Sequence, residues 1–401
     1  MAGWRVEPRF DDCQVNVLVG HVHHEAFMRG SGSSLWGDEL VPTYHYDPPM
    51  PSRTPIVPAG FDPDAAATGD GLFGLDTRPE DARLVVIPVP FDATTSYRAG
   101  TALGPAHVLE ASKQVDLEDI QYGPIWQGGI AMLPIPRDIA TLSKRARAAA
   151  EPIIRAGGAE AGNRTHAKAI ATVNAASERV HGYVAAASER ILDRGAIPAV
   201  LGGDHASPFG LLAELSLRHP GMGILQIDAH ADLRDSFEGF AWSHASIFHN
   251  VMMRLPGVKR LVQVGIRDVG AREVEFVDRS KGRVKTFYDQ RLRDRQYAGA
   301  TWTTLCKDII AALPREVYVS FDIDGLTADL CPRTGTPVPG GLAFPEVCHL
   351  LELLAASGRR VIGFDLCEVA PGAPDDEWNG CVGARVLYKL AGCALRSHKL
   401  I

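Results

Sequence analysis

The chain contains 401 residues, of which 46% are hydrophobic and 22% are charged, as in an ordinary globular protein. The length allows about two or three domains, or one large α/β domain with an extension. The formal net charge is −7, and acids and bases are mixed along the chain, so nucleic-acid binding is not expected. No apolar run reaches the roughly 18 to 20 residues that a membrane span needs, and the N-terminal stretch MAGWRVEPRFDDCQ lacks the pattern of a signal peptide. We therefore expect a cytoplasmic protein without a membrane partner.

The cysteine pattern agrees with that location. The chain has seven cysteines, an odd number, and none of them forms a CxxC pair. Such a pattern favours reduced thiols in a reducing compartment over a disulfide framework.

The first 80 residues differ in texture from the rest of the chain. PTYHYDPPMPSRTPIVPAGFDPD is rich in proline, and AAATGDGLFGLD is punctuated by glycine, so little regular structure is expected there. We interpret residues 1–80 as an N-terminal extension, either a lid or an arm between subunits, and residues 81–401 as the catalytic domain.

From residue 82 onward, predicted strands and helices alternate. The run ARLVVIPVPFD at 82–92 has the β-branched residues of a buried strand, and a helix with Pro105 in its first turn is predicted over 104–115. An alanine-rich segment at 167–195 has helical spacing and ends at a glycine. Further strands are predicted around AIPAVL, GMGILQID, RLVQVGIRD, VKTFYD, EVYVSFDID and RVIGFDLCEV, with helices between most of them. This alternation predicts an α/β fold with a mostly parallel sheet covered by helices on both faces.

Acidic and imidazole side chains follow several of these apolar runs. In open α/β sheets, ligands bind beyond the carboxyl ends of the strands, so the positions of these residues are informative. The residues concerned are His205 after VLGGD, then Asp228, His230 and Asp232 in DAHAD, then Asp322 and Asp324 in SFDID, and finally Glu368 in FDLCE.

The spacing of these residues predicts a metal centre. Side chains at i, i+2 and i+4 of an extended chain project to the same side, which brings Asp228, His230 and Asp232 together. Clustered carboxylates are costly unless cations balance them. A mixed set of imidazoles and carboxylates suits Mn²⁺, Ni²⁺, Fe²⁺ or Zn²⁺, and six ligands exceed what one catalytic ion takes. Two ions that share bridging carboxylates would use all six.

The motifs GGDH, DAHAD and SFDIDGL together resemble those of the ureohydrolase family, the arginase and agmatinase group, over roughly residues 82–395. The resemblance implies a three-layer α/β/α fold, a dinuclear metal centre, and hydrolysis of a guanidino group to urea and an amine by a metal-bound hydroxide. It also assigns the ligands of the two ions. One ion would take His205, Asp228, Asp232 and Asp322, and the other would take Asp228, His230, Asp322 and Asp324.

Three further roles follow from the same resemblance. Asp232, next to the bridging hydroxide, matches a proton acceptor and relay, which is a chemical role that a carboxylate can fill. Glu368 matches the carboxylate that receives the guanidinium, a planar cation that pairs well with a carboxylate. His244 in WSHAS matches the family's active-site histidine, and we expect it to act as a proton shuttle.

Departures from the common motifs point to a small substrate. The segment LRDSFEGFAWSHAS replaces the polar loop that holds arginine in arginases, and HASIF replaces the HGTPF-like residues of agmatinases. Passages such as WSHASIFHN, LCPRTGTPVPGGL and FDLCEVAPG are more similar to the nickel-dependent guanidine hydrolases of the family. This resemblance implies free guanidine as the substrate, Ni²⁺ in preference to Mn²⁺, and a homohexamer. Trp242 and Trp378 are our candidates for residues that narrow the substrate pocket.

Other readings remain open at this point. The substrate could be larger, as in an agmatinase, a guanidinobutyrase, or a hydrolase of alkylguanidines or biguanides. A different class of function is a non-catalytic subunit that stabilises an active partner, although the presence of all six ligands argues against it. The sequence leaves open Ni²⁺ against Mn²⁺, a hexamer against a trimer, and the need for a metal-delivery chaperone.

Overall fold

The computed structural model describes residues 54–57, 61–373 and 376–401, which belong to one compact unit, His45–Ile401. Most of the predicted extension, including residues 1–53, lies outside the described residues. The end of the extension packs on the domain. Leu72, Phe73 and Leu75 are buried in its core, and the ring of Phe73 lies 4.7 Å from that of Tyr388. The folded body thus begins before residue 81.

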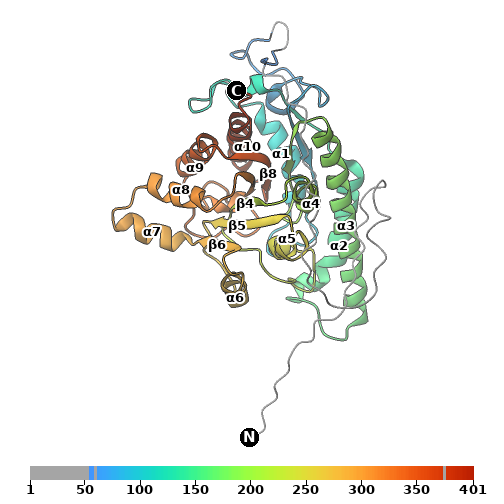
Figure 1. The fold of residues 1–401 in the computed structure, drawn as a ribbon. Coiled ribbons are helices and arrows are strands. Elements are labelled where there is room, and N and C mark those ends of the chain that lie inside the picture. Colours follow the sequence, from blue (N-terminus) through green and yellow to red (C-terminus); the bar gives the residue numbers. More distant parts are fainter. Residues whose placement is uncertain (1–53, 58–60, 374–375) are drawn as a thin grey trace, which may run out of the picture. The chain divides into compact units, whose positions relative to one another are not determined.

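Eight strands form one sheet, and every pair of neighbouring strands is parallel. The strands are β1 (Leu84–Pro88), β2 (Ile130–Met132), β3 (Ile197–Leu201), β4 (Met222–Ile227), β5 (Val258–Val264), β6 (Val284–Phe287), β7 (Glu316–Asp322) and β8 (Arg360–Cys367). Their order across the sheet is β2-β1-β3-β8-β7-β4-β5-β6. Helices flank both faces, so the predicted three-layer α/β/α fold is confirmed (Figure 1).

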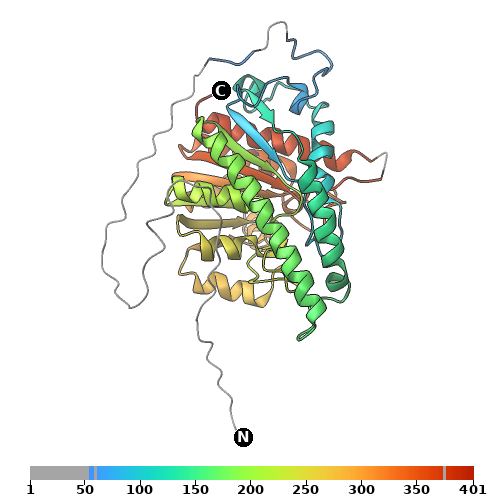
Figure 2. The ribbon, with the colours of Figure 1, turned by 90° about the vertical axis from the view of Figure 1, so that its right-hand side faces the viewer.

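Each face of the sheet is covered by its own set of helices. One set is α2 (Arg137–Arg155), α3 (Arg164–Asp193), α4 (Phe209–Arg218) and α5 (Ile247–Arg254), of which α2 and α3 lie in front of the sheet in Figure 2. The other set is α1 (Gly104–Ser112), α8 (Trp302–Ala311), α9 (Phe344–Ala356) and α10 (Trp378–Ser397). Helices α6 (Ala271–Arg279) and α7 (Asp289–Tyr297) lie near β6, and the short 3₁₀ turns are η1 (Leu72–Gly74), η2 (Thr101–Leu103), η3 (Ile125–Gly128), η4 (His244–Ser246) and η5 (Ile323–Gly325).

Local sequence explains the elements that were predicted. α1 begins with Pro105 in its first turn, as expected. α3 begins where the side chain of Asn163 accepts hydrogen bonds from the backbone N–H groups of Thr165 and His166, which satisfies two donors that the helix itself leaves free. α2, which has buried alanines and isoleucines at helical spacing, is an additional helix that our sequence analysis did not predict.

The four strands β3, β8, β7 and β4 lie side by side and bring distant segments to one edge. Ile227 pairs with Phe321, so Asp228 is level with Asp322, the last residue of β7. Asp322 in turn pairs with Cys367 at the end of β8. Because all four strands run in the same direction, the polar residues that follow them meet at this edge. In the described part of the chain, no helix is long and apolar enough to cross a membrane.

Candidate metal centre and active site

His205 and three aspartates form the first half of the cluster. The Nδ1 atom of His205 lies 3.1 Å from an oxygen of Asp228, 3.1 Å from an oxygen of Asp232 and 3.3 Å from an oxygen of Asp322. All four side chains are at least 90% buried. One imidazole nitrogen and three carboxylate oxygens that converge in this way form a donor set for a divalent cation.

The second half of the cluster shares Asp228 with the first. The Nδ1 atom of His230 lies 3.1 Å from an oxygen of Asp324 and 3.7 Å from the second oxygen of Asp228. The backbone N–H of Asp324 donates to Asp322 (2.9 Å), which joins the two halves. The structure therefore brings together all six residues that we predicted as metal ligands, with Asp228 between the two groups.

The turn that carries Asp232 requires an unusual backbone. Asp232 has a φ of 53°, a conformation that residues other than glycine rarely adopt. This conformation lets the Asp232 carbonyl accept hydrogen bonds from the N–H groups of Phe248 and His249, at the start of α5, while the side chain faces His205. Backbone strain held in place by the surrounding structure is typical of functional sites.

A close approach of two loops places His205. A Cβ atom at Gly203 would lie 2.0 Å from the Phe91 carbonyl oxygen, so only glycine fits between the two segments. The backbone N–H of Asp204 donates to the same carbonyl (2.8 Å). The glycines of the GGDH motif thus let His205 reach the edge of the sheet.

Protonation states reveal the charge imbalance of the cluster. Burial and the charge of Asp228 raise the pKa of Asp232 to about 7, and burial together with Asp324 and Asp228 raises the pKa of Asp322 well above its ordinary value. Burial alone would lower the pKa of His230, but Asp324 and Asp228 raise it to about 12. Without cations, the cluster compensates its negative charge by retaining protons, so its electrostatics fit divalent metal ions.

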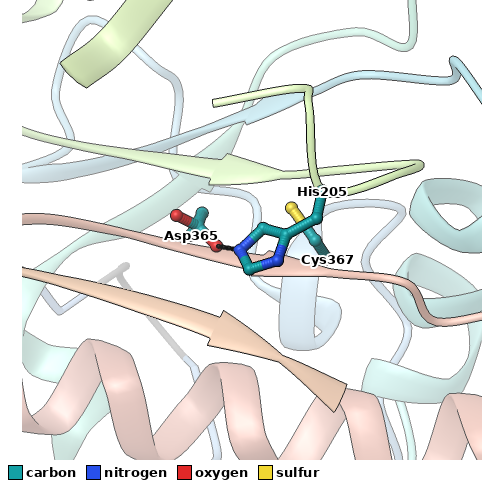
Figure 3. A group of neighbouring side chains, drawn as sticks. All are labelled: His205, Asp365 and Cys367. Carbon is teal, nitrogen blue, oxygen red and sulfur yellow. Dashed lines mark ion pairs between the residues drawn. The ribbon is translucent and has the colours of Figure 1, made fainter. Parts of the chain in front are cut away.

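A hydrogen-bonded group behind His205 fixes its tautomer. On the opposite side of the ring, Nε2 lies 2.9 Å from the hydroxyl of Ser320 and 3.8 Å from Asp365, which stands beside it in Figure 3. Ser320 donates its own proton to Asp365 (2.7 Å). We therefore assign the imidazole proton to Nε2, which leaves the Nδ1 lone pair free for a cation.

Cys367 also lies next to His205 in Figure 3. Burial raises the pKa of its thiol well above the ordinary value, so in the absence of a cation this thiol is neutral. Asp365 and Ser320 support His205, and Cys367 fills the space next to them.

A second support crosses three strands and reaches Asp228. Gln226 donates from Nε2 to the Asp228 carboxylate (2.8 Å) and to the His230 carbonyl (3.1 Å). Gln263 on β5 donates to the Gln226 amide oxygen (2.7 Å), and the hydroxyl of Thr286 on β6 donates to Gln263 (2.7 Å). We call Gln226, Gln263 and Thr286 the glutamine relay. It fixes the side chain of an aspartate that belongs to both halves of the cluster.

Glu368 follows β8 and contributes a carboxylate that is only partly used. Its φ is 64°, and its Oε1 accepts the backbone N–H of His205 (2.9 Å). Its Oε2 is buried and has no hydrogen-bond partner in the part of the chain that the structure describes. Burial, with Asp322 and Asp204 nearby, raises the Glu368 pKa well above its ordinary value. A buried carboxylate oxygen without a partner fits a cationic ligand.

His244 is tied to the loop after β1. Its backbone N–H donates to the hydroxyl of Thr94 (3.1 Å), and its Nδ1 lies 3.4 Å from the same hydroxyl, which in turn donates to Asp204 (3.2 Å). The ring is half-buried and lies 6.0 Å, centroid to centroid, from that of Phe237. Burial and the positive charges on His230 and His205 lower the His244 pKa to about 3, so its imidazole is neutral.

The two predicted tryptophans lie elsewhere. Trp242 is 5% exposed, and its ring lies 4.7 Å from His181 and 4.8 Å from Phe209 in the core. Trp378 begins α10, is 48% exposed, and donates from its indole N–H to the Asp329 carbonyl (3.0 Å). These contacts are those of a core residue and a surface residue, so the roles of both tryptophans in substrate binding stay predictions.

Several residues that we did not predict support the site. Ser320, Asp365 and Gln226 are fully buried polar residues within apolar strands, and Thr94 is almost as buried. A signal for the first three exists in the sequence, because a lone polar side chain in a buried strand needs a partner. Phe248 on α5 packs its ring 5.4 Å from that of His205.

Comparison with known sequences identifies relatives of this chain. Residues 82–392 match the sequence pattern of the Arginase family. The chain is 30% identical over 302 residues to the N(1)-aminopropylagmatine ureohydrolase of Thermus thermophilus, covering 75% of this chain and 87% of that protein. It is 28% identical over 324 residues to the agmatinase of Pyrococcus horikoshii (79% and 94% covered), and 29% identical over 310 residues to the guanidinobutyrase of Pseudomonas aeruginosa (76% and 84% covered).

Solved structures share the fold. The agmatine ureohydrolase of Thermoplasma volcanium superposes with a TM-score of 0.63 at 24% identity, covering 82% of this chain and 94% of that chain. Proclavaminate amidino hydrolase from Streptomyces clavuligerus gives a TM-score of 0.62 at 22% identity, with 83% and 99% covered. These likenesses agree with the three-layer architecture described above.

Proposed function

Because the chain belongs to the arginase family, and is therefore a hydrolase that releases urea from a guanidino compound, we propose that its substrate is free guanidine. The overall reaction takes guanidinium and water to urea and ammonium. A C–O bond forms at the guanidinium carbon, one C–N bond breaks, and the leaving nitrogen departs as ammonia that takes up a proton.

The six clustered residues fit the dinuclear divalent metal centre that is general in this family. We propose the two ligand sets that the family resemblance implies, with Asp228 and Asp322 shared. When bound, the two cations supply the positive charge that lowers the pKa of a water molecule and stabilises a developing negative oxygen. Ni²⁺ is our preferred ion, and Mn²⁺ is the alternative, because the same donor atoms accept both.

The side chains around the cluster have distinct tasks in this proposal. The Glu368 Oε2 atom accepts N–H groups of the guanidinium, which orients its carbon toward the metal centre. Asp232, whose carboxylate lies 3.1 Å from His205 within the cluster, accepts a proton from the attacking water. His244 carries a proton between the site and solvent while Thr94 holds its backbone.

The observation that carries the proposal is the unpartnered Oε2 of Glu368, which is 5% exposed as a residue. A buried anion of this kind is stabilised by a small cation that fills its site completely.

The similarity to the guanidinobutyrase of Pseudomonas aeruginosa makes 4-guanidinobutyrate a second candidate. The two candidates share the chemistry at the metal centre and differ only in what lies beyond the guanidino group.

A urea-release assay tests the proposal. The protein is loaded with Ni²⁺ or with Mn²⁺ and given guanidine, methylguanidine, agmatine, 4-guanidinobutyrate, arginine or a biguanide. We expect urea from guanidine, with the highest kcat/KM in the Ni²⁺ form. Turnover of 4-guanidinobutyrate in place of guanidine would establish the second candidate, and the absence of urea with either metal and every compound would refute both.

A further inference from the structure

Gly335 is a buried glycine, and its backbone has a conformation that any residue can adopt. Its φ lies outside the positive range that favours this residue, in contrast to Gly340 and Gly341 farther along the same segment. A steric clash with the backbone does not explain the presence of glycine at this position either, because a Cβ atom at residue 335 would meet only two atoms within 4 Å. What the missing side chain leaves free is therefore the space that a Cβ atom itself would occupy.

Two acceptor oxygens border that space. A Cβ atom at residue 335 would lie 3.3 Å from Oε2 of Glu368 and 3.6 Å from the backbone carbonyl oxygen of Arg98. The Glu368 atom is the one that has no hydrogen-bond partner within the described ranges. A methyl group there would cover two polar oxygens without offering either of them a proton.

The surrounding contacts hold these oxygens in place. Thr334 donates from its hydroxyl to the Glu368 carbonyl (2.9 Å), which ties the residue before Gly335 to the end of β8. Thr336, the residue after it, lies with its hydroxyl 3.5 Å from the Asp324 carboxylate. The Arg98 side chain donates to the Pro332 carbonyl (2.7 Å), which ties the loop after β1 to the same segment. Gly335 is thus fixed between the metal cluster and the two oxygens.

Glu368 is the guanidino acceptor that the family resemblance implies. We propose that the Arg98 backbone carbonyl is a second acceptor beside it, that the two oxygens form a seat for the guanidino group, and that Gly335 sets the size of the group that this seat admits. The inference rests on the proposed function and deepens it. A guanidinium ion carries N–H donors on all three nitrogens, so it can donate to both oxygens at once. A site whose acceptors bind N–H groups rejects analogues in which an alkyl group replaces the hydrogen of one of these N–H groups.

The test compares Gly335→Ala with Gly182→Ala in the full-length, metal-loaded protein. Gly182 is an exposed helical glycine, and a Cβ atom there would meet nothing within 4 Å, so it serves as a matched control. We expect Gly335→Ala to raise the KM for guanidine by about tenfold or more while kcat changes less, because one misplaced methylene in a fitted site has an effect of roughly this size. In Gly335→Ala, bound metal and Tm should stay at the wild-type values. Gly182→Ala should match the wild type in KM, kcat and bound metal, while its Tm should be equal or higher because alanine is the better helix former.

A second variant tests the Arg98 half of the seat. Arg98→Ala removes the bond to Pro332 and frees the loop that carries the carbonyl, so we expect a higher KM in the same direction. A KM within about twofold of the wild type in Gly335→Ala, or a loss of metal that parallels the loss of activity, would overturn the seat. An unchanged KM in Arg98→Ala would overturn the part played by the Arg98 carbonyl.

The experiments can refute the proposed substrate without refuting the proposed seat, and the reverse also holds. If the wild type hydrolyses 4-guanidinobutyrate and not guanidine, the proposal of guanidine as substrate fails. The seat is then tested with the KM for that compound, because its guanidino end is the part that Glu368 and Arg98 contact.

Discussion

Asp228 is the residue on which both halves of the cluster depend. One of its oxygens faces the His205 ring and accepts from Gln226, and the other accepts the backbone N–H of His230 (2.7 Å). In the absence of metal, burial would raise the Asp228 pKa, but its hydrogen bonds with His205 and His230 lower it below its ordinary value. This carboxylate is therefore ionised and available to cations.

We predict that Asp228→Asn loses most of the bound metal and nearly all activity. The amide removes one negative charge and one shared ligand, so the loss of affinity should exceed the roughly 10- to 100-fold that follows from the loss of a supporting partner. Metal analysis of the purified protein and the urea assay measure both effects. Asp235→Asn, an exposed aspartate of the same loop, is the control. Retention of metal and activity in the Asp228 variant would refute the metal assignment.

We also predict that the gain in Tm on metal binding increases with pH. In the metal-free protein, the Asp232 pKa is raised from 3.8 to about 7, so the folded chain binds more protons than the unfolded chain over that range and loses stability as pH rises. His230, with a pKa raised from 6.5 to about 12, contributes stability that is complete below pH 6.5 and is lost toward pH 12. Cations replace these protons.

Thermal unfolding at pH 5.5, 7.0 and 8.5, with and without Ni²⁺ or Mn²⁺, measures this difference. We expect the smallest gain in Tm at pH 5.5. A gain that is constant or that decreases as pH rises would show that the cluster does not exchange protons for metal.

The sequence spacing identified the clustered residues for a reason that only partly holds in the structure. Alternation along a strand predicted that Asp228, His230 and Asp232 share one side, but β4 ends at Ile227 and Asp232 has a positive φ. The three residues converge in a turn, not in an extended strand. What the spacing captured is their position just beyond a buried strand, where backbone turns and parallel neighbours bring polar residues together.

At the scale of elements, β4, β5 and β6 act on the site through the glutamine relay. Gln226 and Gln263 are fully buried, so each amide must find partners within the sheet. Their side chains satisfy each other and end at Asp228. Two strands that supply no ligand of the cluster thus help to orient one.

We predict that Gln263→Leu weakens metal binding about 10- to 100-fold while the fold persists, which is the usual effect of losing a supporting partner. The substitution removes the donor to Gln226 and leaves that amide free to turn away from Asp228. Gln290→Leu, on an exposed position of α7, is the control. Isothermal titration calorimetry with the metal measures the change in affinity. An affinity equal to that of the wild type would refute the proposed role of the glutamine relay.

Packing between elements also explains what the sequence could not predict. Trp242 lies two residues before His244, and this proximity suggested a place in the pocket. Its indole instead donates to Glu178 on α3, 64 residues away, and the Arg254 guanidinium lies 4.8 Å from its ring. Which way a side chain points from an irregular loop depends on such distant partners, and local sequence does not contain them.

At the scale of the whole molecule, every residue that we assign to the metal centre lies in the part of the chain that the structure describes. The cluster, the relay and Glu368 all lie between residues 205 and 368. We propose that the extension predicted over residues 1–80, of which residues 1–53 lie outside the described part of the chain, acts as a lid or as an arm between subunits of a homo-oligomer, with the hexamer preferred over the trimer.

Deletion of residues 1–53 should therefore leave the bound metal unchanged. If the segment is an arm, the mass measured by light scattering falls from that of a hexamer of 43.2 kDa chains, and if it is a lid, the mass is kept and KM or kcat changes. If the truncated protein forms an oligomer with the same number of chains and has the same kcat and KM, both proposed roles are refuted. Loss of metal would contradict the independence of the centre.

The position of β8 has a consequence for how the protein is made. β8 is the last strand to be synthesised, yet it lies in the middle of the sheet, between β3 and β7. Until it emerges, β2, β1 and β3 have no bridge to β7, β4, β5 and β6, so His205 is on one half-sheet and the aspartates are on the other. Such long-range pairing is slow compared with local folding. We therefore expect a nascent chain shorter than about residue 367 to lack the complete centre, and the cluster to assemble with its cations only after β8 has been made.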